Sequence, residues 1–243
     1  MNNPKICVLT DNEFSREYTY RILNKRGLKV DFFCSPESSK NIFSDAEIKE
    51  LNLKDENQLS KILDYDICFS SHSKQIFPKK LIENVLCINI HPGLNPYNRG
   101  WFPSVFSILN KKPAGVTIHL IDEKIDHGDI IVQEEIAIES HYTSKTLYKK
   151  IIELEEKLFE KVIDEILSLE FSKTKMQSEG NYNSKNDFEN LKKIDLNKKV
   201  YMHEAIDFLR SMSHPPNRNA FFIDKNGEKV FVELSLFKDK KNT

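Results

Sequence analysis

Asn89 and His91 follow a short apolar run and are two residues apart, so their side chains would point to the same side of a strand. The Asn amide is a neutral donor suited to an oxyanion, and the His imidazole can carry a proton near neutral pH. Asp126, in a later loop that contains Gly128, could lie beside the imidazole and stabilise its protonated form. These residue types predict acid–base and oxyanion chemistry.

The candidate set of Asn89, His91 and Asp126 contains no Ser or Cys nucleophile. It therefore favours direct attack on the substrate by an external amine or water over a covalent enzyme intermediate. A purely structural interpretation is open on residue types alone, because His91 could simply end its strand and Asp126 could simply make a turn.

A metal site is the other chemical possibility, because several His and Asp side chains are close together in the sequence. No H-E-x-x-H or C-x-x-C spacing is present, and His119 alternates with apolar residues as in a strand, so we expect no metal. The cysteines lie in or beside apolar runs, which predicts buried, reduced thiols. The side chains considered are His91, His119, His127, Asp122, Asp126 and Asp129, and the cysteines are Cys7, Cys34, Cys68 and Cys87.

Short apolar runs alternate with amphipathic segments, which predicts an α/β fold with a Rossmann-like, mostly parallel sheet flanked by helices. No G-x-G-x-x-G follows the first run, so a dinucleotide is not indicated there. Asn12 begins the first helix, where it could help to bind a phosphate or could only cap the helix. The expected strands span residues 6–9, 28–34, 65–70, 85–88, 115–121 and 130–137. The first expected helix ends before Gly27, and the other expected helices span residues 57–63, 78–84, 103–110 and 144–170.

Three loops follow expected strands and are rich in Gly, Pro or polar residues: 71–75, 89–101 and 122–129. Ligands of open α/β sheets bind at such loops, so we expect the site there. The long amphipathic helix over 144–170 is expected only to pack.

The pattern changes after the long helix. Periodicity fades between residues 172 and 199, which predicts a catalytic domain over 1–175 and a small module over 176–243. In the module we expect a helix over 200–213 and a β-hairpin over 219–237 with an Asn226-Gly227 turn. Such an apolar hairpin needs a partner surface, either the first domain or a second copy in a homodimer.

Composition excludes several classes of partner. Charged residues make up 30% of the chain, but the formal net charge is −1, so there is no overall attraction for nucleic acid or anionic lipid. No apolar stretch approaches the length of a membrane span, and the N-terminal residues do not resemble a signal peptide. We expect a soluble cytoplasmic protein that binds neither nucleic acid nor membrane.

Three motifs carry a resemblance to a known family: Asn89-Ile90-His91-Pro92, Gly115-Val116-Thr117 and Ile125-Asp126-x-Gly128-Asp129. They resemble the signature of the folate-dependent formyltransferases over roughly residues 1–170. Residues 99–103 and 217–222 are similar to stretches of one subgroup, the nucleotide-sugar N-formyltransferases. The family often has Ser where this chain has Gly93.

The resemblance implies a mechanism in which a sugar amine attacks the formyl carbon of N10-formyltetrahydrofolate and tetrahydrofolate leaves. It implies that Asn89 and protonated His91 stabilise the oxyanion, while Asp126 orients and electrostatically supports His91. A carboxylate beside an imidazole favours its charged form, so we also expect Asp126 to raise the pKa of His91 above the usual value. The resemblance also implies a pterin pocket formed by Ser73, Lys74, Gln75, Ile76, Phe77, Asp122 and Lys124, and a nucleotide-sugar site that includes Asn12, His72, Tyr97, Asn98, Arg99, Trp101, Tyr182 and Asn219.

The resemblance favours dTDP-4-amino-4,6-dideoxyglucose as acceptor, for a bacterial surface polysaccharide such as the O-antigen of lipopolysaccharide. A dTDP-3-amino-3,6-dideoxyhexose is an alternative. Methionyl-tRNA would call for a larger basic C-terminal domain, and a glycinamide ribonucleotide enzyme would leave residues 176–243 unexplained. A nucleotide-sugar-binding protein without activity is the non-enzyme alternative.

Overall fold

The computed structural model describes residues 4–38 and 48–239, and its centre is a seven-stranded sheet of order β3-β2-β1-β4-β5-β7-β8. The first five strands in this order, β3, β2, β1, β4 and β5, are parallel to one another. Strand β7 pairs antiparallel with both β5 and β8. The predicted mostly parallel α/β sheet is thus confirmed. The strands are β1 (Ile6–Thr10), β2 (Val30–Cys34), β3 (Ile48–Glu50), β4 (Ile67–Ser71), β5 (Leu86–His91), β7 (Ala114–Leu120) and β8 (Ile130–Ile136).

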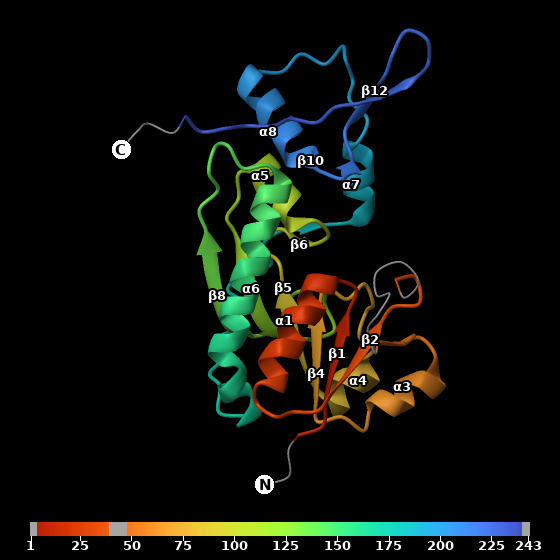
Figure 1. Ribbon diagram of the computed structural model, residues 1–243, viewed down its shortest axis with the longest axis vertical. Coiled ribbons are helices and arrows are strands. Elements are labelled where there is room, and N and C mark those ends of the chain that lie inside the picture. Colours follow the sequence, from red (N-terminus) through yellow and green to blue (C-terminus); the bar gives the residue numbers. More distant parts are fainter. Residues whose placement is uncertain (1–3, 39–47, 240–243) are drawn as a thin grey trace.

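Helices cover both faces of the sheet (Figure 1). On one face, α1 (Glu13–Asn24) and α6 (Ser144–Leu167) lie side by side and share an apolar core with the sheet. On the other face, α3 (Glu56–Ile62) and α4 (Lys79–Asn84) enclose a second, smaller core. All four cysteines are free and buried, as predicted.

Strand β5 brings the candidate chemistry to the edge of the sheet. Its residues Ile88 and Ile90 point into the core below α1 and α6, whereas Cys87 points into the core below α3 and α4. Because side chains alternate along a strand, Asn89 and His91 share the face of Cys87. They lie at the carboxyl end of β5, which is next to the antiparallel part of the sheet.

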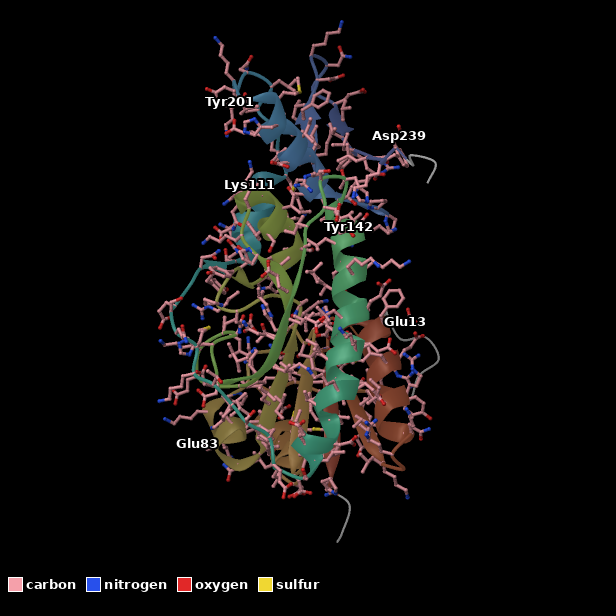
Figure 2. All side chains as sticks on the ribbon, turned by 90° about the vertical axis from the view of Figure 1, so that its left-hand side faces the viewer. Glu13, Glu83, Lys111, Tyr142, Tyr201 and Asp239 are labelled. Atoms are coloured by element: carbon pink, nitrogen blue, oxygen red, sulfur yellow. The ribbon has the colours of Figure 1, made fainter. Side chains whose placement is uncertain are left out.

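The C-terminal module lies beyond one end of the sheet, and α6 reaches from the sheet to this module (Figure 1). A third apolar core joins α5 (Pro103–Asn110) to α7 (Lys185–Leu191) and α8 (Met202–Met212). Two-residue strands β6 (Arg99–Gly100) and β9 (Tyr182–Asn183) pair in parallel. Tyr201 lies near the module's end of the molecule and Glu83 near the opposite end (Figure 2).

The predicted hairpin exists but is shorter than expected. Strands β12 (Phe221–Ile223) and β13 (Lys229–Phe231) pair antiparallel, and residues 232–239 are not in a strand. A second small pair is formed by β10 (Ser213–His214) and β11 (Asn217–Arg218). Helix α7 was not expected; its signal is the capping box between Ser184 and Asp187. The domain division near residue 175 stays a prediction.

The described helices give no candidate for crossing a membrane, since none is both long and apolar enough. Among residues 4–38 and 48–239, no group of three His, Cys, Asp or Glu side chains could hold a metal ion.

Candidate active site

The fold brings Asn89, His91 and Asp126 together. Nδ2 of Asn89 donates to Oδ1 of Asp126 at 2.9 Å, and Nδ1 of His91 lies 3.5 Å from Oδ2 of the same carboxylate. His91 is buried with 3% of its surface exposed, whereas Asn89 is half-buried. A carboxylate between an amide donor and an imidazole can orient both groups.

Asp126 is held in place by its backbone as well as its side chain. It has a left-handed conformation with φ of 49°, which is uncommon for a residue with a side chain. Nδ2 of Asn95 donates to its carbonyl at 3.0 Å, and the N–H of Gly100 donates to Oδ2 at 2.9 Å. The backbone of Gly100 is in turn paired with β9. The C-terminal segment therefore supports the position of Asp126.

The other ring nitrogen of His91, Nε2, is buried and has no hydrogen-bond partner among the described residues. A β-carbon at position 93 would lie 2.5 Å from this nitrogen, so the observed ring orientation requires Gly93. With Nδ1–H directed to Asp126, Nε2 has a free lone pair and can accept a proton.

The charge state of His91 differs from the one that we expected. Burial lowers the pKa of His91 from 6.5 to about 4, and the Asp126 carboxylate, which raises the pKa, offsets only part of this effect. The expectation of a pKa above the usual value is therefore wrong, although the direction of the Asp126 contribution is right. His91 is neutral at pH 7 and can act as a base.

His119 belongs to the site in a role that was not predicted. It lies opposite Asn89 in the β5–β7 pairing, and Nδ2 of Asn89 is 3.3 Å from its Nε2. Nδ1 of His119 lies 2.7 Å from the carbonyl of Leu120, so Nδ1 carries the proton and Nε2 accepts from Asn89. Burial lowers the pKa of His119 as well. The ring therefore helps to orient the Asn89 amide.

The residues expected around a pterin occupy two loops. In the first loop, Gln75 bonds to the backbone of Leu51 and Leu53, and Phe77 is buried in the smaller sheet core. Ile76 is exposed, and the hydroxyl of Ser73 accepts a hydrogen bond from the Gln75 N–H. The N–H of Lys74 donates to the carboxylate of Asp11. In the second loop, the carboxylate of Asp122 accepts from the N–H of Lys124.

Comparison with known proteins decides the family. A model of the formyl transferase family matches residues 33–163, and a model of the N-formyltransferase dimerization C-terminal domain matches residues 187–238. The chain belongs to the formyl transferase family. It is an N-formyltransferase.

Three relatives align with most of this chain. A dTDP-4-amino-4,6-dideoxyglucose formyltransferase of Mycobacterium bovis is 39% identical over 97% of both chains. A crystal structure of a 4-N formyltransferase from Francisella tularensis is 52% identical, with a TM-score of 0.92 over 98% of this chain and 100% of the other. A sugar 3N-formyl transferase solved with dTDP and 5-N-formyl-THF is 27% identical, with a TM-score of 0.73 over 90% and 84%.

More distant relatives align over a shorter region. A methionyl-tRNA formyltransferase of Bacillus cytotoxicus is 29% identical over 164 residues, which are 64% of this chain and 52% of that protein.

The residues expected at the sugar site of this N-formyltransferase fall into separate groups. Buried Arg99 and exposed Tyr182 are paired across β6 and β9, and exposed Tyr97 lies two residues before β6. Arg99 donates to the carbonyl of Ile125 at 2.9 Å. Trp101 follows β6 and has the ammonium group of Lys185 over its ring. Asn98 is fully buried, and its side chain bonds to four neighbours: Ser107, Asn110, Asn181 and Asn183.

The other expected sugar-site residues lie on different elements of the enzyme. Asn12 caps α1 by accepting from the N–H of Ser15, and its amide also donates to the hydroxyl of Tyr148. His72 follows β4 and faces Glu155 on α6. Asn219, in the C-terminal module, donates to the carbonyl of Met212. The structure therefore groups Asn12 and His72 around α6 and leaves Asn219 within the module.

Proposed function

We propose that this enzyme transfers the formyl group of N10-formyltetrahydrofolate to the 4-amine of dTDP-4-amino-4,6-dideoxyglucose. The cluster of Asn89, His91 and Asp126 is the observation that supports formyl transfer as the type of reaction. The choice of this acceptor is supported by the similarity to the mycobacterial enzyme of that name, which extends over 97% of both chains. The similarity to a sugar 3N-formyl transferase solved with dTDP and 5-N-formyl-THF supports both the nucleotide and the folate.

The described residues fit a formyl donor. Asn89 lies opposite Ser70 of β4, and the loop over 73–77 that is expected to hold the pterin begins three residues after Ser70. The half-buried amide of Asn89 is therefore close to the start of this loop. Nε2 of His91 is a buried nitrogen without a partner among the described residues, as expected of a group that meets a substrate. The donor, when bound, supplies the formyl group and leaves as tetrahydrofolate.

Asn89 supplies a hydrogen-bond donor where negative charge develops on the formyl oxygen. Both hydrogens of its amide are engaged in the structure, at 2.9 Å to Asp126 and at 3.3 Å to His119. The longer bond to the neutral imidazole is the weaker one, because a bond to a carboxylate is charge-assisted. Asn89 therefore exchanges its bond to His119 for the formyl oxygen and keeps its bond to Asp126.

His91 takes the proton that the attacking amine must lose. Its neutral Nε2 is the accepting atom, and the imidazolium formed is stabilised by Asp126 across the Nδ1–Oδ2 contact. This assignment replaces the expected protonated His91, because burial keeps the ring neutral before the reaction. Asp126 thus assists catalysis by making the buried imidazole more basic.

The acceptor is tested by incubating the enzyme with N10-formyltetrahydrofolate and single acceptors, followed by mass spectrometry. The acceptors are the 4-amino gluco and galacto sugars, a dTDP-3-amino-3,6-dideoxyhexose, glycinamide ribonucleotide and methionyl-tRNA. We expect formylation of the 4-amino gluco sugar at the highest kcat/KM. Preferential formylation of any other acceptor would overturn the acceptor assignment.

The product would serve the synthesis of a bacterial surface polysaccharide such as the O-antigen of lipopolysaccharide, in the cytoplasm, where the sequence predicts the enzyme to be. A homodimer is part of the proposal, because the C-terminal residues match a dimerization-domain model. Methionyl-tRNA is less well supported, since its enzymes align with this chain over only 52% of their length.

A further inference from the structure

Glu155 is a buried acidic residue on the packing face of α6. It is 0% exposed and lies between apolar residues such as Leu154 and Leu158, which fill the main core. A carboxylate in such a position loses its hydration and is unfavourable unless it is paired. An apolar side chain would continue the face of the helix, so packing alone does not explain Glu155. The expectation that this helix only packs is incomplete.

Both carboxylate oxygens of Glu155 lie 3.0 Å from Nε2 of His72. The hydroxyl of Tyr18 donates to the same carboxylate at 3.4 Å and is 2.9 Å from the hydroxyl of Ser71, the last residue of β4. Burial and the Glu155 carboxylate raise the pKa of Tyr18, so its hydroxyl keeps the proton that it donates. Glu155 is thus connected to the end of β4 and to the first residue after it.

His72 has an unusual backbone conformation. Its φ is 56°, in the left-handed region that residues with a side chain seldom adopt. Such a conformation persists when the surroundings hold it. The ring of His72 contacts Glu155 and also the Tyr148 ring, in a T-shaped arrangement with 5.9 Å between centroids. These contacts fix the direction in which the chain leaves β4.

We propose that Glu155 is a positioning residue which, acting through His72, holds the adjoining 73–77 loop in the shape that binds the formyl donor. This inference rests on the proposed function, in which that loop receives the donor. Glu155 reaches the loop from α6, on the far side of β4, and its contribution is to the backbone geometry of the loop. His72 was expected at the sugar site, but its ring contacts Glu155 and Tyr148 on α6, so loss of the His72–Glu155 contact should leave the part of the sugar site at the β6–β9 pair unchanged.

The test variant is Glu155→Gln, which keeps the size of the side chain and removes its charge. We expect the KM for N10-formyltetrahydrofolate to rise about tenfold, as for loss of a charge-assisted hydrogen bond that orders a binding loop. The KM for the nucleotide sugar should change by less than about twofold, which is the usual effect of a substitution remote from a site. Glu156→Gln is the matched control, because Glu156 is an exposed neighbour paired with Arg21.

His72→Asn provides an independent variant, since Asn tolerates the left-handed conformation but lacks the ring that contacts Glu155. It should raise the donor KM as Glu155→Gln does. In the double variant, Glu155→Gln should add less than about a twofold change to the effect of His72→Asn, because Glu155 acts through His72. If Glu155→Gln does not fold, His72→Asn alone carries the test.

Direct titration with 5-formyltetrahydrofolate, followed by calorimetry, separates this inference from the proposed function. Weaker binding in both variants would support the positioning role even if no sugar acceptor were formylated. A Glu155→Gln variant with a lower melting temperature but wild-type donor KM and affinity would show a merely structural role and overturn the inference.

Discussion

Nδ2 of Asn89 donates to Oδ1 of Asp126 at 2.9 Å, which determines how the Asn89 amide faces the site. The carboxylate can only accept, so the nitrogen of the amide, and not its oxygen, must be on this side. The same carboxylate lies 3.5 Å from His91. One side chain thus links the donor and the base of the proposed reaction.

Asp126→Asn can keep an acceptor for Asn89, but it removes the negative charge beside His91 and the Oδ2 acceptor of the Gly100 N–H. We expect the pKa of His91, about 4 in the wild type, to fall further, because the carboxylate is the group that raises it. Turnover should fall by roughly two orders of magnitude or more, since a less basic imidazole is a poorer proton acceptor.

The pKa of His91 is measured by NMR titration of its ring protons in both proteins. Equal titration midpoints would mean that Asp126 does not interact with His91. A wild-type midpoint near 7 would contradict the neutral state that burial gives to this ring.

Burial of His91 also makes folding depend on pH. Between about pH 6.5 and 4 the unfolded chain binds a proton at His91 that the folded chain does not bind. The free energy of unfolding should therefore decrease as the pH falls through this range, with no further contribution from His91 below about pH 4. His119, whose pKa is also lowered, should contribute in the same direction.

This dependence is measured by urea unfolding at a series of pH values. His91→Asn should show a smaller decrease than the wild type between pH 6.5 and 4, because Asn does not titrate there. Parallel curves for the two proteins would contradict the buried, neutral His91.

Gly93→Ala would place a β-carbon 2.5 Å from Nε2 of His91 and force the ring to move. Displacing a catalytic group by about 1 Å costs on the order of a hundredfold in rate, so we expect a loss in kcat of this size. The melting temperature should fall as well, because the ring that must move is buried. An unchanged kcat would show that the observed ring orientation is not the reactive one.

The exposed apolar side chains of the C-terminal module support the proposed homodimer, and we expect sedimentation at twice the chain mass of 28.4 kDa. Val230→Glu combined with Phe231→Glu, on strand β13, should weaken the dimer because charge disfavours a buried apolar interface. Phe14→Glu, at an exposed aromatic residue of α1, is the control and should remain dimeric. A monomeric wild type would rule out the dimer. The module's large exposed apolar residues include Leu196, Tyr201, Met202, Val230, Phe231 and Phe237.

Local patterns in the sequence were sufficient for much of the fold. Helix α5 begins at Pro103 and ends at Asn110 as predicted, because Pro favours the first turn of a helix. Short elements such as β3, β6 and β9 were not predicted, since two or three residues carry no periodicity and their pairing depends on distant partners.

The site shows the same limit. The spacing of Asn89 and His91 indicated that they share one face of a strand. The contact of His119 with Asn89 depends on the register between β5 and β7, which the sequence of neither strand specifies. The pKa of His91 depends on how deeply the ring is buried, and the sequence motif does not reveal this. The burial of Glu155 was not predicted, because it is an acidic residue on an otherwise apolar helix face.

The most direct test of the account is the turnover number of His91→Asn with N10-formyltetrahydrofolate and dTDP-4-amino-4,6-dideoxyglucose, measured on protein shown to be folded by circular dichroism. We expect a loss of about two to four orders of magnitude, the usual scale for removing an acid–base group. A variant that keeps more than roughly a tenth of the wild-type rate, far above what loss of a proton acceptor allows, would contradict the assignment of His91 as the catalytic base.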